Sequence, residues 1–119
     1  MGKQVSETLQ EMLGILKKGQ MTEGQKIYFA DSVVTQEGNQ SPIVGKQASI
    51  DRLDTFRETI GVAAFVSYAI GDVAVAGDSS FYDAVLTLKL KNGETISLEQ
   101  VVKTEWRDGK IVKERYYHG

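Results

Sequence analysis

Side chains able to do chemistry occur at two places in the sequence, near residue 37 and along the C-terminal segment. Glu37 follows an extended run rich in β-branched residues and precedes the turn residue Gly38. A carboxylate at a strand end that faces a pocket would act as a general base or a ligand contact if burial raised its pKa. The alternative is a solvated turn residue, and both interpretations stay open.

Three polar side chains alternate along the C-terminal segment and share one face of a strand: Glu114, Tyr116 and His118. An inward-facing Glu114 would need a donor, which Tyr116 or His118 could supply, because an unpaired buried carboxylate is costly. With Glu37 they would form a polar cluster in a pocket. The alternative is an exposed terminal strand whose charges pair across the sheet, and fraying competes with any role for His118.

Four further side chains are candidates for contact with a ligand. Gln100 and Thr104 interrupt an otherwise apolar strand face, where they could orient a ligand or bond to one another or to water. Tyr68 and Trp106 could line the same pocket, although aromatic residues more often belong to a core or an interface.

Composition narrows the possible chemistry. The 119 residues are 41% hydrophobic and 25% charged, which predicts one globular domain over residues 1–119. The chain has no Cys and one His, so we expect no disulfide, no metal centre, no cofactor and a cytoplasmic location. A net charge of −2 argues against a nucleic-acid partner. No apolar run approaches the roughly 18 residues of a membrane helix, so no membrane partner is expected.

Three helices are predicted from apolar residues at three- and four-residue spacing. They span Ser6–Lys18, Thr22–Ala30 and Lys46–Thr59. The second helix should end near Asp31. A short strand over Val33–Gln36 and a polar turn over residues 37–42 then lead to the third helix.

From Val62 onward the apolar period changes to alternation, which predicts four strands. They span Val62–Asp72, Val73–Leu90 with a break near Gly77, Thr95–Trp106 and Lys110–His118. Asn-Gly and Asp-Gly turns join the last three strands as antiparallel hairpins. The faces expected beneath the helices carry Tyr82, Ala84, Leu86, Leu88 and Leu90 on one strand, and Leu98, Gln100, Val102, Thr104 and Trp106 on the next.

These elements predict an α+β fold in which three N-terminal helices pack on a curved antiparallel sheet. A sheet bent around the third helix would enclose a cone-shaped barrel with one open end. Concave, mostly apolar sites of this kind are the usual binding places of small ligands.

Three motifs resemble a known family in their order and separation. They are F-A-D-S-V-V at residues 29–34, P-I-V-G-K at 42–46 and W-R-D-G-K-I-V-K-E-R-Y-Y at 106–117. The chain is similar over nearly its whole length to the SnoaL-like branch of the nuclear transport factor 2-like superfamily. This resemblance implies a cone-shaped, cystatin-like α+β barrel and a homodimer through the outer sheet face. The superfamily includes polyketide cyclases, ketosteroid isomerase, limonene epoxide hydrolase and non-catalytic binding modules, so the fold leaves the function open.

The resemblance also assigns positions of the isomerase site. Its base falls on Glu37, whereas its oxyanion-binding Tyr and Asp fall on Met12 and Val102, which donate no hydrogen bond. Losing such donors costs several kcal/mol of transition-state stabilisation, so ketosteroid isomerisation is not expected. The Asp-Arg-Asp arrangement of the epoxide hydrolase is not evident either.

Two functions are compatible with this sequence. The first is binding of a small, mostly apolar molecule in the pocket, with isomerase, cyclase or hydrolase chemistry that uses a carboxylate base. The second is a non-catalytic dimerisation or protein-binding module, which predicts a pocket filled by its own side chains and an exposed Glu37.

Overall fold

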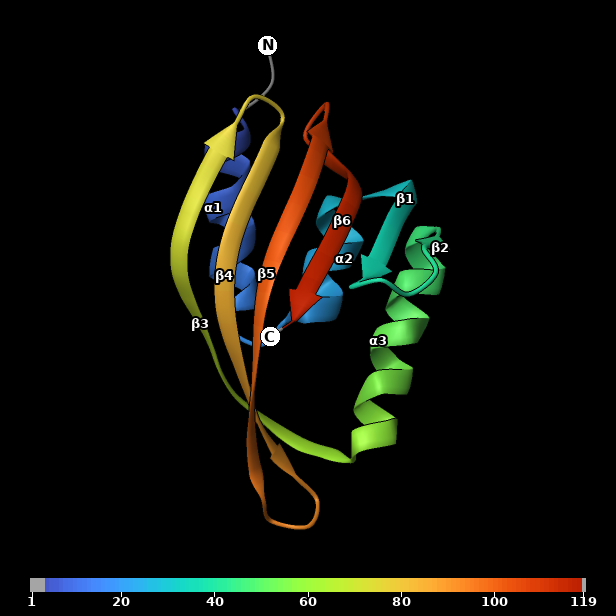
Figure 1. Cartoon of the computed structure of the whole chain (residues 1–119), viewed down its shortest axis with the longest axis vertical. Helices are drawn as coiled ribbons and strands as arrows, with labels where there is room; N and C mark the ends of the chain where they lie inside the picture. The colour runs from blue at the N-terminus through green and yellow to red at the C-terminus, as the bar shows by residue number, and fades with distance from the viewer. Residues whose placement is uncertain (1–3, 119) are drawn as a thin grey trace.

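The computed structural model describes residues 4–118 as three helices and one six-stranded sheet. The elements are α1 (Val5–Leu16), α2 (Met21–Tyr28), β1 (Phe29–Glu37), β2 (Ile43–Val44), α3 (Lys46–Ile60), β3 (Val62–Ala76), β4 (Ser79–Leu90), β5 (Thr95–Arg107) and β6 (Lys110–His118). The strand order is β2-β1-β6-β5-β4-β3, and the sheet curls with the helices on one side (Figure 1). The predicted α+β class is confirmed.

Within these residues no helix is long and apolar enough to cross a membrane.

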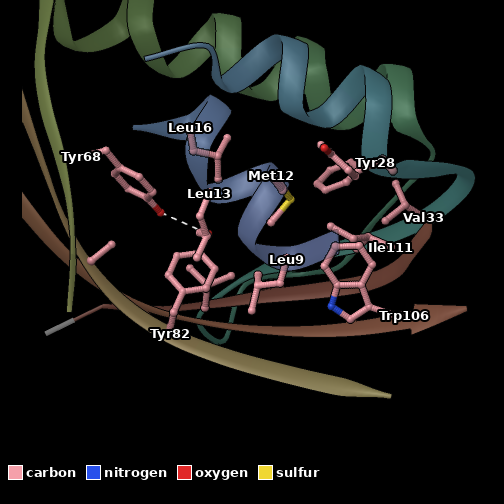
Figure 2. Close-up of a cluster of buried hydrophobic side chains, with 13 residues drawn as sticks. Leu9, Met12, Leu13, Leu16, Tyr28, Val33, Tyr68, Tyr82, Trp106 and Ile111 are labelled. Atoms are coloured by element: carbon pink, nitrogen blue, oxygen red, sulfur yellow. Dashed lines mark hydrogen bonds between the residues drawn. The ribbon is translucent and has the colours of Figure 1, made fainter. Parts of the chain in front are cut away.

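The core lies between α1 and the inner face of the sheet (Figure 2). Leu9 and Leu13 of α1 are almost fully buried there. The strands contribute alternate residues, such as Tyr82 and Ala84 from β4 and Val102 from β5. The faces predicted to lie beneath the helices are therefore the inner faces, because side chains alternate across a strand.

Both predicted hairpin turns form where the turn dipeptides stand. Gly93, with φ of +92°, lies in the turn between β4 and β5, and the Asn92 side chain accepts the backbone N–H of Glu94. Asp108 and Gly109 have φ of +53° and +76° between β5 and β6. Positive φ at both Asp108 and Gly109 matches the twist of a two-residue hairpin, whereas in the first turn only Gly93 has positive φ. Both turns set the register of the strands that they join.

One strand boundary differs from the prediction. β3 continues past Asp72 to Ala76, and the turn lies between Ala76 and Ser79. Gly71 and Asp72 instead mark a register shift in the β3–β4 ladder, where the Asp83 carboxylate accepts the backbone N–H of Asp72. A bulge and a strand end use the same small and polar residues, so the sequence pattern did not separate them.

The second helix is also shorter than predicted. It ends at Tyr28, and β1 begins at Phe29, which pairs with Ile111 of β6. Asp31 lies inside this strand, exposed, with its carboxylate 3.6 Å from the Lys46 ammonium. Pairing with β6 holds residues 29 and 30 extended and overrides their helical pattern.

The expectation of a purely antiparallel sheet is wrong for β1, which pairs with β6 in parallel. Thr35 lies opposite Glu114 and Glu37 opposite Tyr116. β2 adds an antiparallel edge to β1 through Val34 and Val44. No hairpin connects β1 to β6, so no local turn signal indicates their relative direction. This pairing brings the Glu37 region beside the C-terminal strand.

Candidate functional site

A cavity of about 860 Å³ lies between the helices and the inner face of the sheet. Side chains from α1, α2, α3 and the sheet form its wall. Its apolar members are Met12, Leu16, Met21, Phe29, Leu53, Phe56, Leu86 and Leu98. Its polar members come mainly from the ends of β1 and β6 and from the middle of the sheet.

Strand register arranges the polar groups of β5 and β6 in rows across the inner face. Thr104 lies opposite Glu114, and Gln100 lies opposite His118. Between these rows Val102 faces Tyr116. The predicted inward face of β6 is therefore the face that lines the cavity, with Glu114, Tyr116 and His118 all in its wall.

Glu114 is the deepest carboxyl group in this wall, with 5% of the residue exposed. The Tyr116 hydroxyl donates to its Oε1 at 2.6 Å and the Thr104 hydroxyl to its Oε2 at 2.8 Å. Burial raises the pKa of Glu114 above its ordinary value, although both hydrogen bonds and the Arg52 charge oppose the rise. Tyr116 is the donor that the sequence suggested for an inward-facing Glu114.

Glu37 lies in the cavity wall with about a third of its side chain exposed. Its Oε2 is 2.5 Å from His118 Nε2, and its Oε1 is 3.7 Å from Arg52 Nη2. The predicted polar cluster is thus two neighbouring groups, with Glu37 paired to His118 and Glu114 to Tyr116.

Arg52 is a cavity residue that was not among the candidates identified from the sequence. Its side chain is 24% exposed, and its guanidinium carbon lies 5.7 Å from the centre of the Tyr116 ring. Residues three and four apart share a helix face, and Arg52 follows Ser49 by three and precedes Phe56 by four. All three line the cavity, so this spacing could have identified Arg52.

Tyr68 and Gln100 meet in the cavity wall, and Tyr82 joins them. Gln100 Nε2 donates to the Tyr68 hydroxyl at 2.7 Å, and the Tyr68 and Tyr82 hydroxyls lie 3.4 Å apart (Figure 2). Burial raises the pKa of Tyr68 to about 12 and that of Tyr82 well above its ordinary value. Tyr82 was predicted only as a core residue.

Trp106 and Thr104 lie outside the cavity wall. Trp106 is 4% exposed, donates from Nε1 to the Ser80 hydroxyl at 2.9 Å and meets the Tyr28 ring edge-on. It lines a separate hollow between α1 and the β5–β6 hairpin. Thr104 is fully buried and reaches the site only through Glu114.

No set of three or more His, Cys, Asp or Glu side chains within residues 4–118 is arranged to hold a metal ion. The charged groups of the cavity wall are Glu37, Arg52, Glu99, Glu114 and, when protonated, His118. The chemistry available from these side chains is proton transfer and hydrogen bonding.

The chain matches no protein-family model and no curated protein sequence. Solved structures do resemble it. A proposed SnoaL-like polyketide cyclase from Mesorhizobium loti has a TM-score of 0.81 and 21% identity, covering 98% of this chain and 100% of that chain. A nuclear transport factor 2-like protein of unknown function from Burkholderia pseudomallei has a TM-score of 0.78 and 14% identity, over 96% and 89% of the two chains. IdmH, a proposed polyketide cyclase from Streptomyces antibioticus, has a TM-score of 0.75 and 14% identity, over 97% and 91%.

These likenesses extend over nearly the whole length of each chain. They confirm that the chain shares the fold of these SnoaL-like and nuclear transport factor 2-like structures, as the sequence motifs suggested. At such identities a shared fold carries no function with it.

Proposed function

We propose that this SnoaL-like domain binds a small, mostly apolar molecule in its cavity, and that a carboxylate in the wall acts as a base in proton transfer. Isomerases, cyclases and hydrolases use steps of this kind. The observation that carries the proposal is Glu114, a buried carboxyl group in the wall of an otherwise largely apolar cavity. The cavity volume of about 860 Å³ falls within the range of small-molecule sites.

Glu114 is a better base than Glu37. A general base works best when its pKa lies near the working pH, and burial moves the pKa of Glu114 in that direction. Glu37, the base predicted from the sequence, already contacts His118 and Arg52. In this proposal Glu37 holds these two side chains in place at the cavity.

Proposed polyketide cyclases occur among the structural neighbours and support a cyclase role for this cavity. The competing interpretation, a non-catalytic module, predicted a pocket filled by its own side chains. Met12, Phe56 and Leu86 line the cavity and leave about 860 Å³ open, which argues against such filling.

Naphthalene binding tests the cavity as a ligand site. We expect naphthalene to bind wild-type protein in ligand-observed NMR. Leu98→Trp should weaken this binding at least tenfold, because the indole ring is larger than the half-buried Leu98 side chain and fills part of the cavity. Val44→Trp is the matched control, since Val44 is 68% exposed and lies on the edge strand β2. Absence of naphthalene binding, or equal loss in both variants, would refute the proposal.

A second proposal concerns the outer face of the sheet, where a homodimer is expected from the sequence resemblance. Val101 and Tyr117 are neighbours across the β5–β6 ladder and are 45% and 41% exposed. Exposed apolar pairs on a sheet face favour an interface. We propose that two copies of the chain associate through this face.

A further inference from the structure

The turn that follows β1 forms part of the cavity wall, although its side chains are not buried. Gly38, Asn39 and Gln40, which we call the rim segment, line the cavity next to Glu37. The segment leaves the end of β1 beside β6 (Figure 1). None of residues 38–42 is buried. Hydrogen bonds, and not the packing of apolar side chains, therefore hold the rim segment in the cavity wall.

Three of these hydrogen bonds are local or join backbone groups. The Gly38 N–H donates to the Tyr116 carbonyl at 2.7 Å, and the Gln40 N–H donates to the Glu37 carbonyl at 2.9 Å. The Gln36 side-chain amide donates to the Gln40 carbonyl at 3.0 Å. They shape the turn and tie its first residue to β6.

Arg115 of β6 supplies the side-chain contacts that reach the rim segment from far away in the sequence. Its Nε donates to the Gly38 carbonyl and its Nη2 donates to Asn39 Oδ1, both at 3.1 Å. A guanidinium presents its N–H groups in a rigid planar fork, so one side chain holds two adjacent residues. Within residues 4–118, no other side chain except that of Gln36 forms a hydrogen bond with the rim segment.

Arg115 reaches the rim segment from the outer face of the sheet. Its neighbours Glu114 and Tyr116 line the cavity, so alternation along the strand places Arg115 on the opposite face. There its guanidinium carbon lies 4.9 Å from the centre of the Tyr117 ring, and Lys103 stands directly opposite on β5. Two like charges opposite one another destabilise a sheet. Pairing between strands therefore does not explain this arginine, whereas its contacts with the rim segment do.

We propose that Arg115 is a latch that keeps the rim segment closed, and that a ligand enters and leaves the cavity when its two hydrogen bonds to this segment open. Because none of residues 38–42 is buried, the segment can move without opening the core. Arg115 is a positioning residue, since it holds the rim segment from outside the cavity. The inference rests on the proposed function in one respect, that the cavity takes a ligand.

Amide hydrogen exchange measures the closure of the rim segment without any ligand. We expect Arg115→Met to speed exchange of the Gly38 and Gln40 amides at least about tenfold, because hydrogen bonds from a charged group are strong. Asn39→Ala removes one of the two acceptors from an exposed turn residue and should speed exchange by a smaller factor. Lys113→Met is the matched control, since Lys113 lies on the same strand face and pairs with a carboxylate of β5, and it should leave both amides unchanged.

The rates of naphthalene binding supply a readout that a contact with the ligand would not give. In NMR line-shape analysis, Arg115→Met should raise the association and dissociation rate constants at least about threefold and change the affinity less than twofold, because a lower barrier speeds both directions equally. Unchanged rate constants, or exchange that is equally faster throughout the β4–β5 ladder in both rim variants, would overturn the latch. If naphthalene binds and these tests fail, the proposed function stands without the latch; if naphthalene does not bind, both fall.

Discussion

Glu114 carries a carboxyl group that is buried and yet belongs to the cavity wall. Two hydroxyl donors hold it, and burial still raises its pKa. At the scale of single residues, this combination separates it from Glu37, which is more exposed and contacts His118 and Arg52. Two predictions follow from its chemistry.

The raised pKa of Glu114 has a consequence for stability. An acid whose native pKa lies above its unfolded value favours the native state while protonated, so this contribution is lost as pH rises from about 4.5 through the native pKa. We therefore expect Glu114→Gln to gain stability relative to wild type as pH rises over this window, measured by urea unfolding at several pH values. A difference between the two proteins that is independent of pH would contradict the prediction.

The proposed role of Glu114 as a base predicts catalysis of hydrogen exchange. Wild-type protein should accelerate deuterium uptake by 2-tetralone in D₂O, followed by NMR, and Glu114→Gln should lower the enzymatic rate by about 100-fold or more. Glu105→Gln is the control, since Glu105 pairs with Lys113 away from the cavity. A larger loss in Glu37→Gln than in Glu114→Gln would transfer the role of base to Glu37.

At the scale of elements, the ends of α3 and the turns of the sheet decide where the cavity residues stand. Gly61 ends α3 with φ of +71° and ψ of +53°, and its carbonyl accepts the backbone N–H of Lys91 in the β4–β5 turn. This contact ties the helix that carries Arg52 to the long hairpin (Figure 1). The left-handed conformation explains why glycine occupies this position.

Two glycine substitutions should therefore have opposite effects. Gly61→Ala is expected to destabilise the protein by about 1 kcal/mol, because a Cβ disfavours the left-handed conformation. Gly14→Ala, near the C-terminal end of α1 with open space around the added Cβ, should stabilise it by about 0.5–1 kcal/mol. Urea unfolding measures both, and changes of the same sign would show that backbone conformation does not control these positions.

At the scale of the whole molecule, the curled sheet has two different faces. Its inner face supplies the core and the cavity wall, whereas its outer face exposes Val101 and Tyr117. A charge placed in a dimer interface without a partner costs several kcal/mol, which makes the proposed homodimer testable.

Light scattering coupled to size-exclusion chromatography should give twice the chain mass for wild-type protein. Val101→Lys should give the monomer mass, whereas Val44→Lys, a control on the exposed edge strand β2, should remain dimeric. A monomeric wild-type protein at micromolar concentration would exclude the homodimer.

The sequence by itself determined the features that depend on neighbouring residues. Alternation along β4 and β5 identified their inner faces, and the Asn-Gly and Asp-Gly pairs located both hairpin turns. These features are local because side-chain period and turn conformation depend on a few adjacent residues. The candidate residues Glu114, Tyr116 and Gln100 were found in this way, from their places on a face.

Only the tertiary structure decided which of these residues meet. The parallel pairing of β1 with β6 brings Glu37 to His118, 81 positions away in the sequence, and no local pattern indicates that pairing. Likewise, Tyr68 meets Tyr82 and Gln100 only because the register of three strands aligns them. Register across a sheet is set by packing of the whole buried face, so the cluster of Tyr68, Tyr82 and Gln100 became visible only in the folded chain.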